Sequence, residues 1–131
     1  MPDKHFKETV FLNVDLDLFS RQNLQPLLSA LGSKIVVLHA GRHGRTYRAH
    51  VELARSPKSA DTAIRRFAAL IRALPRSERR LWDAATIRDF NIGVQAAMRP
   101  HSHEIPLAGK TIDLVAALKA RIVITVYAPE A

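Results

Sequence analysis

Cysteine is absent from this chain, and acidic and aromatic residues are scarce. Without cysteine the protein forms neither disulfides nor thiolate zinc sites, and a cysteine nucleophile is excluded. No apolar run approaches membrane-spanning length, and the charged first ten residues lack the apolar segment of a secretory leader. We therefore expect a cytoplasmic protein. Its 131 residues, 47% of them hydrophobic, predict a single domain over residues 1–131.

The shortage of acidic residues is confined to the middle of the chain. Twenty Lys and Arg stand against twelve Asp and Glu, which gives a net charge of +8. Residues 1–41 and residues 89–131 are each balanced, whereas residues 42–88 hold eleven Arg and one Lys against four acidic residues. This excess is typical either of a solvated helix face or of a surface that attracts a polyanion or an acidic partner.

Hydrophobic periodicity predicts five strands and four helices. Residues 10–18 alternate strictly, with Val10, Leu12, Val14, Leu16 and Leu18 on one side and Phe11, Asn13, Asp15 and Asp17 on the other. Further strands are predicted over residues 33–40, 46–53, 88–97 and 121–127, with the turn GRHGR between the second and third. Helices are predicted over 24–31 after an Asn23 N-cap, from a Ser59 cap to Leu74, over 77–85 and over 111–119.

The order of these elements matches the ferredoxin-like βαββαβ pattern, followed by one further helix and strand. We therefore expect an α+β fold, with an antiparallel sheet, helices on one face and a C-terminal αβ extension. In such a sheet the first strand lies between the third and the fourth, and strands are apolar on one side only. The first, third and fourth predicted strands have this pattern.

Three segments, spread over most of the chain, resemble a family of small uncharacterised bacterial α+β proteins filed as a domain of unknown function. They are the opening strand with its acidic end and the short helix closing in Leu31 and Gly32, the strand FNIGVQA (Phe90 to Ala96), and IPLAGKTIDLVAALKARIVITVY (Ile105 to Tyr127). Because some members look like immunity or partner-binding proteins, the resemblance implies an interaction role. It implies no catalytic residues, and the arginine-rich middle departs from the family's pattern.

Polar residues of the expected central strands form the first candidate site. If these strands are neighbours, they place on the open face Asn13, Asp15, Asp17, Arg48, His50, Glu52, Asn91 and Gln95. This face either binds a polar ligand or a protein partner, or is a solvated surface with cross-strand ion pairs. Gly93, in the middle of its strand, predicts a notch that a ligand, side chain or backbone could enter.

The histidines form no metal site that spacing alone identifies. His101 and His103 are two residues apart in a proline-bounded loop with only Glu104 beside them. His39 and His43 flank the start of the predicted hairpin turn, and we interpret them as solvent-exposed turn residues. We expect no metal and no other cofactor.

Enzyme motifs are missing from the sequence. None of the serines lies in the glycine-flanked elbow of a serine hydrolase, and AGRHG lacks the spacing of a phosphate-binding loop. The GK-T triplet of LAGKT precedes a helix without the required upstream glycine. The sequence therefore predicts a protein that is not an enzyme.

Two functions follow from these patterns. The first is an interaction domain that binds a protein partner or a second copy of itself through the open sheet face or a sheet edge. The alternative is a basic module that binds nucleic acid or another polyanion through region 60–80, with contacts from Arg65, Arg66, Arg72, Arg76, Arg79 and Arg80. Base stacking on the sheet is not expected, because Phe11 is the one obvious aromatic residue predicted for the open face.

Residues 81–93, LWDAATIRDFNIG, are interpreted as a junction between a helix and a strand. Leu81 and Trp82 are expected to pack against the core, and Asp83 and Arg88 to be surface charges. Only the last residues of this segment, on the open face, are candidates for function.

Overall fold

The structure, a computed structural model, describes residues 7–129 as an α+β fold with one five-stranded mixed sheet. Its strands are β1 (Val10–Ser20), β2 (Ile35–His43), β3 (Thr46–Leu53), β4 (Ile87–Gln95) and β5 (Arg121–Tyr127). Its helices are α1 (Gln25–Leu31), α2 (Ala60–Arg72), α3 (Arg76–Ala84) and α4 (Gly109–Ala117), with a 3-10 turn, η1 (Gly32–Lys34), after α1. Within these residues, no helix combines the length and apolar character needed to cross a membrane.

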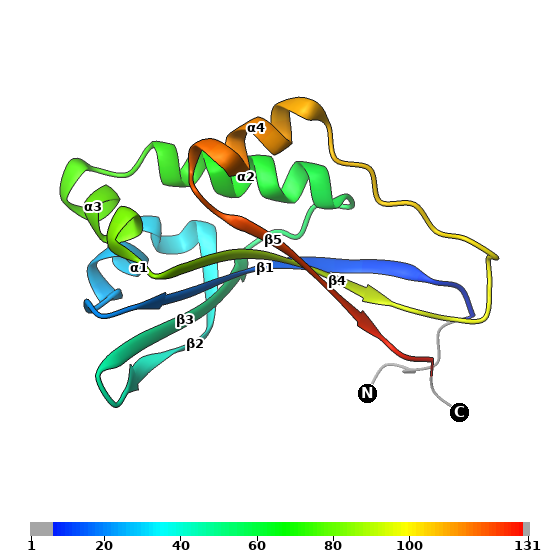
Figure 1. Cartoon of the computed structure of the whole chain (residues 1–131), viewed down its shortest axis with the longest axis horizontal. Coiled ribbons are helices and arrows are strands. Elements are labelled where there is room, and N and C mark those ends of the chain that lie inside the picture. Colours follow the sequence, from blue (N-terminus) through cyan, green and yellow to red (C-terminus); the bar gives the residue numbers. More distant parts are fainter. Residues whose placement is uncertain (1–6, 130–131) are drawn as a thin grey trace.

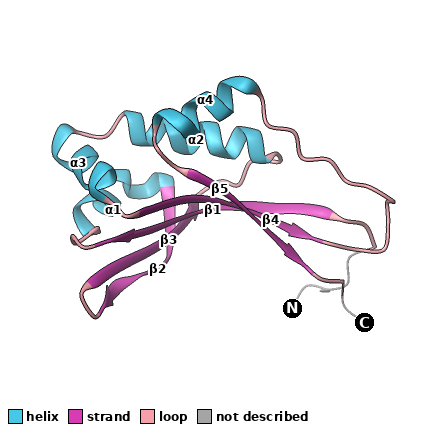
Figure 2. Ribbon diagram, viewed as in Figure 1, coloured by secondary structure: helices cyan, strands magenta, loops and turns pink. Residues whose placement is uncertain are grey.

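The strands lie in the order β2-β3-β1-β4-β5. Strand β1 is antiparallel to both of its neighbours, β2 and β3 form an antiparallel hairpin, and β5 runs parallel to β4. The α-helices lie on one side of the sheet, and no helix of the described chain lies on the other (Figures 1 and 2). The last strand therefore joins the sheet of its own chain. Because the helices all lie on one side, the other face of the sheet is left open.

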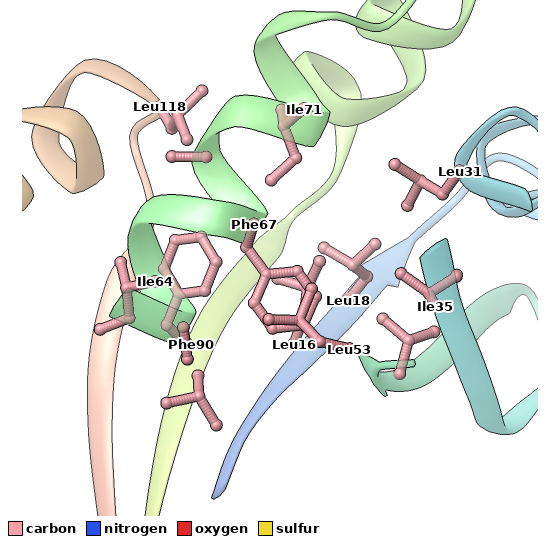
Figure 3. Packing of buried hydrophobic residues seen from close by; sticks show 14 of the residues in the cluster. Leu16, Leu18, Leu31, Ile35, Leu53, Ile64, Phe67, Ile71, Phe90 and Leu118 are labelled. Atoms are coloured by element: carbon pink, nitrogen blue, oxygen red, sulfur yellow. The ribbon is translucent and has the colours of Figure 1, made fainter. Parts of the chain in front are cut away.

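One hydrophobic core fills the space between the helices and the sheet. Phe67 of α2 is fully buried and packs on Phe90 of β4, with ring centroids 5.8 Å apart. Figure 3 shows these rings between α2 and the strands, close to Leu16 and Leu18 of β1. Because side chains alternate along a strand, burial of these leucines turns the aspartates between and beside them to the open face.

The alternation of β1 is interrupted at Leu12, which the sequence predicted to lie on the core side. The pairing with β4 shifts its register between Phe11 and Asn13, so this part of β1 holds a β-bulge. Phe11 consequently packs against the core, opposite Val94, whereas Leu12 is exposed and lies near Gly93. The prediction that Phe11 faces the open side was wrong, because strict alternation does not anticipate an extra residue.

Strand β2 is longer at its C-terminal end than expected. It runs to His43, and the turn contains only Gly44 and Arg45. Gly44 has a φ of 63°, a conformation that glycine adopts without strain. His39 and His43 are therefore strand residues, and their interpretation as turn residues was wrong.

The helix starts follow the predicted caps with one difference. Ser59 caps α2 as expected, because its hydroxyl accepts a hydrogen bond from the backbone N–H of Thr62. At α1 the N-cap position is held by Leu24, one residue later than predicted. Asn23 still accepts the N–H of Gln25 at 2.9 Å, so it satisfies a backbone donor from just outside the helix.

Asp61, in the first turn of α2, ties that helix to the start of α4. Its Oδ1 atom accepts hydrogen bonds from the backbone N–H of Ala108 at 2.8 Å and from the hydroxyl of Thr111 at 2.6 Å. These two donors, the Thr111 hydroxyl first, hold the pKa of Asp61 below its ordinary value. The long loop before α4 is thus anchored where it reaches the helices.

Residues 81–93 connect the end of α3 to β4. Two side chains of this segment also form hydrogen bonds with the C-terminal end of α4. Trp82 is fully buried, and its Nε1–H donates to the carbonyl of Leu118 at 3.1 Å. Arg88, predicted to be a surface charge, is half-buried and donates to backbone carbonyls of Ala85, Trp82 and Lys119. That prediction was wrong because the carbonyls that Arg88 satisfies are brought together only by folding.

Candidate functional site

The side of the sheet opposite the helices, called here the open face, brings together the polar residues that the sequence singled out. Register and alternation place on it Asn13, Asp15, Asp17, Arg48, His50, Glu52, Asn91 and Gln95. Asp89, which alternation along its strand had also predicted for this side, lies there too, as do Phe19, His39, Arg121 and Thr125, which the sequence had not predicted for it. The open face is therefore a continuous surface that extends over all five strands.

A row of charged and imidazole side chains crosses the open face. Register places His39 beside His50, His50 beside Asp17, Asp17 beside Asp89, and Asp89 beside Arg121. Asp17 Oδ1 lies 2.6 Å from His50 Nδ1, and Asp89 accepts two hydrogen bonds from the Arg121 guanidinium at 2.7 and 2.8 Å. Each of the two central carboxylates thus has a partner on its outer side, which offsets their mutual repulsion.

Asp15 lies beside this row in a second group of polar side chains. The amide of Asn13 donates to Asp15 Oδ1 at 2.9 Å and to Glu52 Oε2 at 3.3 Å. Partial burial raises the pKa of Asp15 above its ordinary value of 3.8, and the charges of Asp17 and Glu52 raise it further. His50 and the Asn13 hydrogen bond oppose this rise.

The described part of the chain contains no ion pair with Asp15 or Glu52. The middle of the open face therefore carries two carboxylates, Asp15 and Glu52, that form no ion pair within residues 7–129. This is unexpected for a chain with a net charge of +8.

The notch predicted at Gly93 is filled by a side chain of the same sheet. A β-carbon at this position would lie 3.1 Å from Asn13 Oδ1. Gly93 thus allows the bulged part of β1 to lie close to β4. Beside it, the Thr125 hydroxyl donates to Asn91 Oδ1 at 2.8 Å, and the Gln95 amide donates to backbone carbonyls at the ends of β4 and β5. Asn91 and Gln95 are therefore engaged within the sheet.

Arg48 packs on Phe19 at the other end of the open face. The guanidinium carbon lies 4.8 Å from the centre of the Phe19 ring, a separation typical of a cation–π contact. The imidazole of His50 meets the same ring edge-on, with centroids 6.3 Å apart. The signal for Phe19 was present in the sequence, since alternation continues past Leu18, but the strand was predicted to end there.

Three histidines gather where β2 meets β3. The ring of His39 lies 5.9 Å from that of His50 and 5.2 Å from that of His43. The Nε2 atoms of His39 and His43 are 3.0 Å apart. Over residues 7–129, no three His, Asp or Glu side chains are arranged to hold a metal ion together. His101 and His103 are exposed in their loop.

Apolar side chains adjoin this polar surface along β2. Val36, Val37 and Leu38 are 44, 45 and 52% exposed, and a second β-bulge lies between Val37 and His39. Because β2 is an outer strand, one side of its backbone pairs with no other strand of the described chain. An exposed edge of this kind is a common place for another chain to add a strand.

The arginines of region 60–80 lie on the helical side of the molecule. Arg65, Arg66, Arg72, Arg76 and Arg80 are exposed, and Arg79 is half-buried. Two of the six are paired one helical turn away, Arg65 with Asp61 at 3.0 Å and Arg79 with Asp83 at 3.4 Å. These surface pairs reduce the positive charge available to a ligand.

Basic residues of the helical side line two separate grooves. One, of about 440 Å³, is lined by Lys34, Arg55 and Arg66 together with apolar side chains, and it has no carboxylate. The other, of about 510 Å³, is lined by the cations of Arg72, Arg79 and Lys110 and by one acidic residue, Asp113. The first groove is therefore the more favourable for an anion.

No protein-family model, curated protein or solved structure matches this chain.

Proposed function

We propose that this protein is a non-enzymatic interaction domain whose open face binds a protein partner that presents a basic segment. One observation carries the proposal: Asp15, Asp17 and Glu52 form a group of carboxylates in the middle of an uncovered sheet. Partial burial and, after it, the charges of Asp17 and Glu52 raise the pKa of Asp15. A lysine or arginine from a partner would lower that pKa, since opposite charges favour the ionised carboxylate.

The neighbouring edge supports a protein rather than a small ligand. Strand β2 offers backbone donors and acceptors beside exposed Val36 and Leu38. An extended segment added to such an edge gains main-chain hydrogen bonds, and its alternate side chains lie over the open face. Its cations would then reach toward β3 and β1, where Glu52 and Asp15 are paired in register.

We also propose that the fold is ferredoxin-like. Its support is the strand order β2-β3-β1-β4 with antiparallel pairing throughout, to which β5 adds a parallel strand. We also propose that the chain is a cytoplasmic bacterial protein, similar in role to the partner-binding proteins that its sequence motifs resemble.

The proposal is tested by titrating two peptides into ¹⁵N-labelled protein and following the amide signals. One peptide alternates Val and Lys, and its control alternates Val and Glu. We expect the Lys peptide to shift the amides of β1, β2 and β3, and the Asp15→Asn/Glu52→Gln variant to weaken this binding about tenfold. Arg72→Ala, on the helical side, should leave it unchanged. Equal binding of the Glu peptide, or shifts confined to α2 and α3, would overturn the proposal.

Self-association is distinguished by sedimentation of the protein alone. The proposed separate partner predicts a monomer at micromolar concentration. A dimer that dissociates in the Asp15→Asn/Glu52→Gln variant would replace the partner by a second copy of the chain.

A second candidate function rests on the groove of Lys34, Arg55 and Arg66. We propose, as the alternative, that this groove and the exposed arginines of α2 and α3 bind nucleic acid or another polyanion. Binding of a generic single-stranded DNA should then weaken steeply with salt, and Arg55→Ala/Arg66→Ala should reduce both the affinity and the salt slope. Binding that is absent at low salt, or insensitive to salt, would contradict it.

A further inference from the structure

We infer that His39 and His43 together bind a divalent late transition-metal ion, Ni²⁺ or Cu²⁺, on the β2–β3 hairpin. This inference does not depend on the proposed partner binding. It assigns a role to two residues of β2 whose spacing in the sequence, four residues apart, had suggested nothing.

The separation of the two ring nitrogens carries the inference. His39 Nε2 and His43 Nε2 are 3.0 Å apart. Two nitrogens at this separation, each about 2.0–2.1 Å from a metal ion, subtend an angle of about 90° at the metal. That is the angle between adjacent positions of square-planar or octahedral coordination, which Cu²⁺ and Ni²⁺ prefer.

The hairpin supplies the rigidity that a two-histidine site needs. Register pairs His39 with His50 and His43 with Thr46, and the bulge between Val37 and His39 sets the direction of the His39 side chain. The Thr46 hydroxyl donates to the carbonyl of His43 at 3.0 Å, which holds the strand end. The rings are therefore already close together before a metal arrives.

The charges around the pair favour a cation on one side only. His50, with its Nδ1 atom on Asp17, faces His39. The carboxylate of Asp17, 2.6 Å from His50 Nδ1, places negative charge on that side of the pair, which favours a nearby cation. Arg42, Arg45 and Arg48 are the cations of the hairpin, and Arg42 donates to the carbonyl of Gly44 at 2.9 Å.

Binding of a metal ion requires one of the two imidazoles to change tautomer. In the metal-free pair, one Nε2–H donates to the lone pair of the other Nε2. When a metal ion binds, the donating ring changes tautomer: it gives up its Nε2 proton and takes up one from solvent on Nδ1, so that both neutral rings coordinate through Nε2 and carry a proton on Nδ1. Since no third side chain of the described residues is placed to coordinate, water fills the remaining positions.

The test is calorimetric titration of NiCl₂ into the full chain, in a His5→Gln background so that the N-terminal segment contributes no imidazole. We expect one site per chain, with binding weakened about tenfold or more in His39→Gln and in His43→Gln. The matched control is His101→Gln/His103→Gln, which removes two exposed imidazoles and should bind as the background does.

Three results would overturn the inference. They are the absence of saturable binding, an affinity of His39→Gln or His43→Gln equal to that of the His5→Gln background, and loss of the site in the His101→Gln/His103→Gln control. Thermal unfolding of each variant separates loss of the site from loss of the fold. In addition, the imidazole NMR signals of His39 and His43 should broaden together with the first equivalent of Ni²⁺, before those of His101 and His103.

Discussion

Asp17 of β1 and Asp89 of β4 oppose each other in register across the middle of the sheet. Like charges in this arrangement destabilise a sheet unless each has another partner. Here His50 lies beside Asp17, and Arg121 donates two hydrogen bonds to Asp89, which also raises the pKa of Arg121. With these two carboxylates engaged, Asp15 and Glu52 are left as the acidic groups most available to a partner.

Asp15→Asn is expected to stabilise the protein at neutral pH. The folded-state pKa of Asp15 is raised, so the folded protein holds the proton more tightly than the unfolded chain. The stability that this tighter proton binding gives the folded protein is fully present below the unfolded pKa of 3.8, and it is lost as the pH rises through the higher folded pKa. The variant should therefore gain up to about 1 kcal/mol in urea unfolding at pH 7 and nothing at pH 3. A loss of stability at pH 7 would contradict this account of the open face.

Asp61→Ala is expected to destabilise the fold by about 1–3 kcal/mol, because the buried hydroxyl of Thr111 loses its acceptor. The pKa of Asp61 is lowered, so its contribution is present above 3.8 and disappears as the pH falls through the lower folded value. Unfolding curves of the variant and the wild type should thus converge in acid. Arg65→Ala, which removes only the surface pair, is the control and should cost less than about 1 kcal/mol.

Gly93→Ala is expected to cost about 1 kcal/mol, because its β-carbon would meet Asn13 Oδ1 at 3.1 Å. The same substitution in an Asn13→Ala background should cost much less. A double-mutant cycle measured by thermal unfolding gives the coupling between the two positions directly. Additive effects would show that the Asn13 side chain is not what fills the notch.

Arg88→Met is expected to destabilise the protein by about 1–3 kcal/mol, because carbonyls at the ends of α3 and α4 lose a charged donor. The loss should be accompanied by faster hydrogen exchange in α3 and in the turn before β5. Arg80→Met, at an exposed position of α3, is the matched control. If the two substitutions destabilise the protein equally, Arg88 contributes no more than an exposed surface charge.

The sequence predicted the elements better than their ends. Period-two alternation placed Leu16 and Leu18 inside and Asp15 and Asp17 outside, because burial of one strand face imposes that pattern. The Ser59 cap and the glycine at the hairpin turn were also readable, since each reflects a local backbone requirement.

The remaining details depend on contacts between segments distant in the chain. The bulge at Leu12 moves Phe11 to the core, and no local signal marks it, because a bulge is defined only against the partner strand. The His39 and His43 pair and the Arg88 cap arise in the same way. The candidate site was therefore predicted as a set of polar residues on one face, without the pairings that decide which of them are available.

The position of β1 in the sheet has a consequence for how the chain folds during synthesis. This strand is synthesised before the other four, yet it forms the centre of the sheet, and one of its two neighbours, β4, is made only after residues 21–86. Until then one edge of β1 is unpaired and Leu16 and Leu18 lack the cover of Phe90. Pairings of such long sequence separation slow folding, so completion of the core must wait for the second half of the chain.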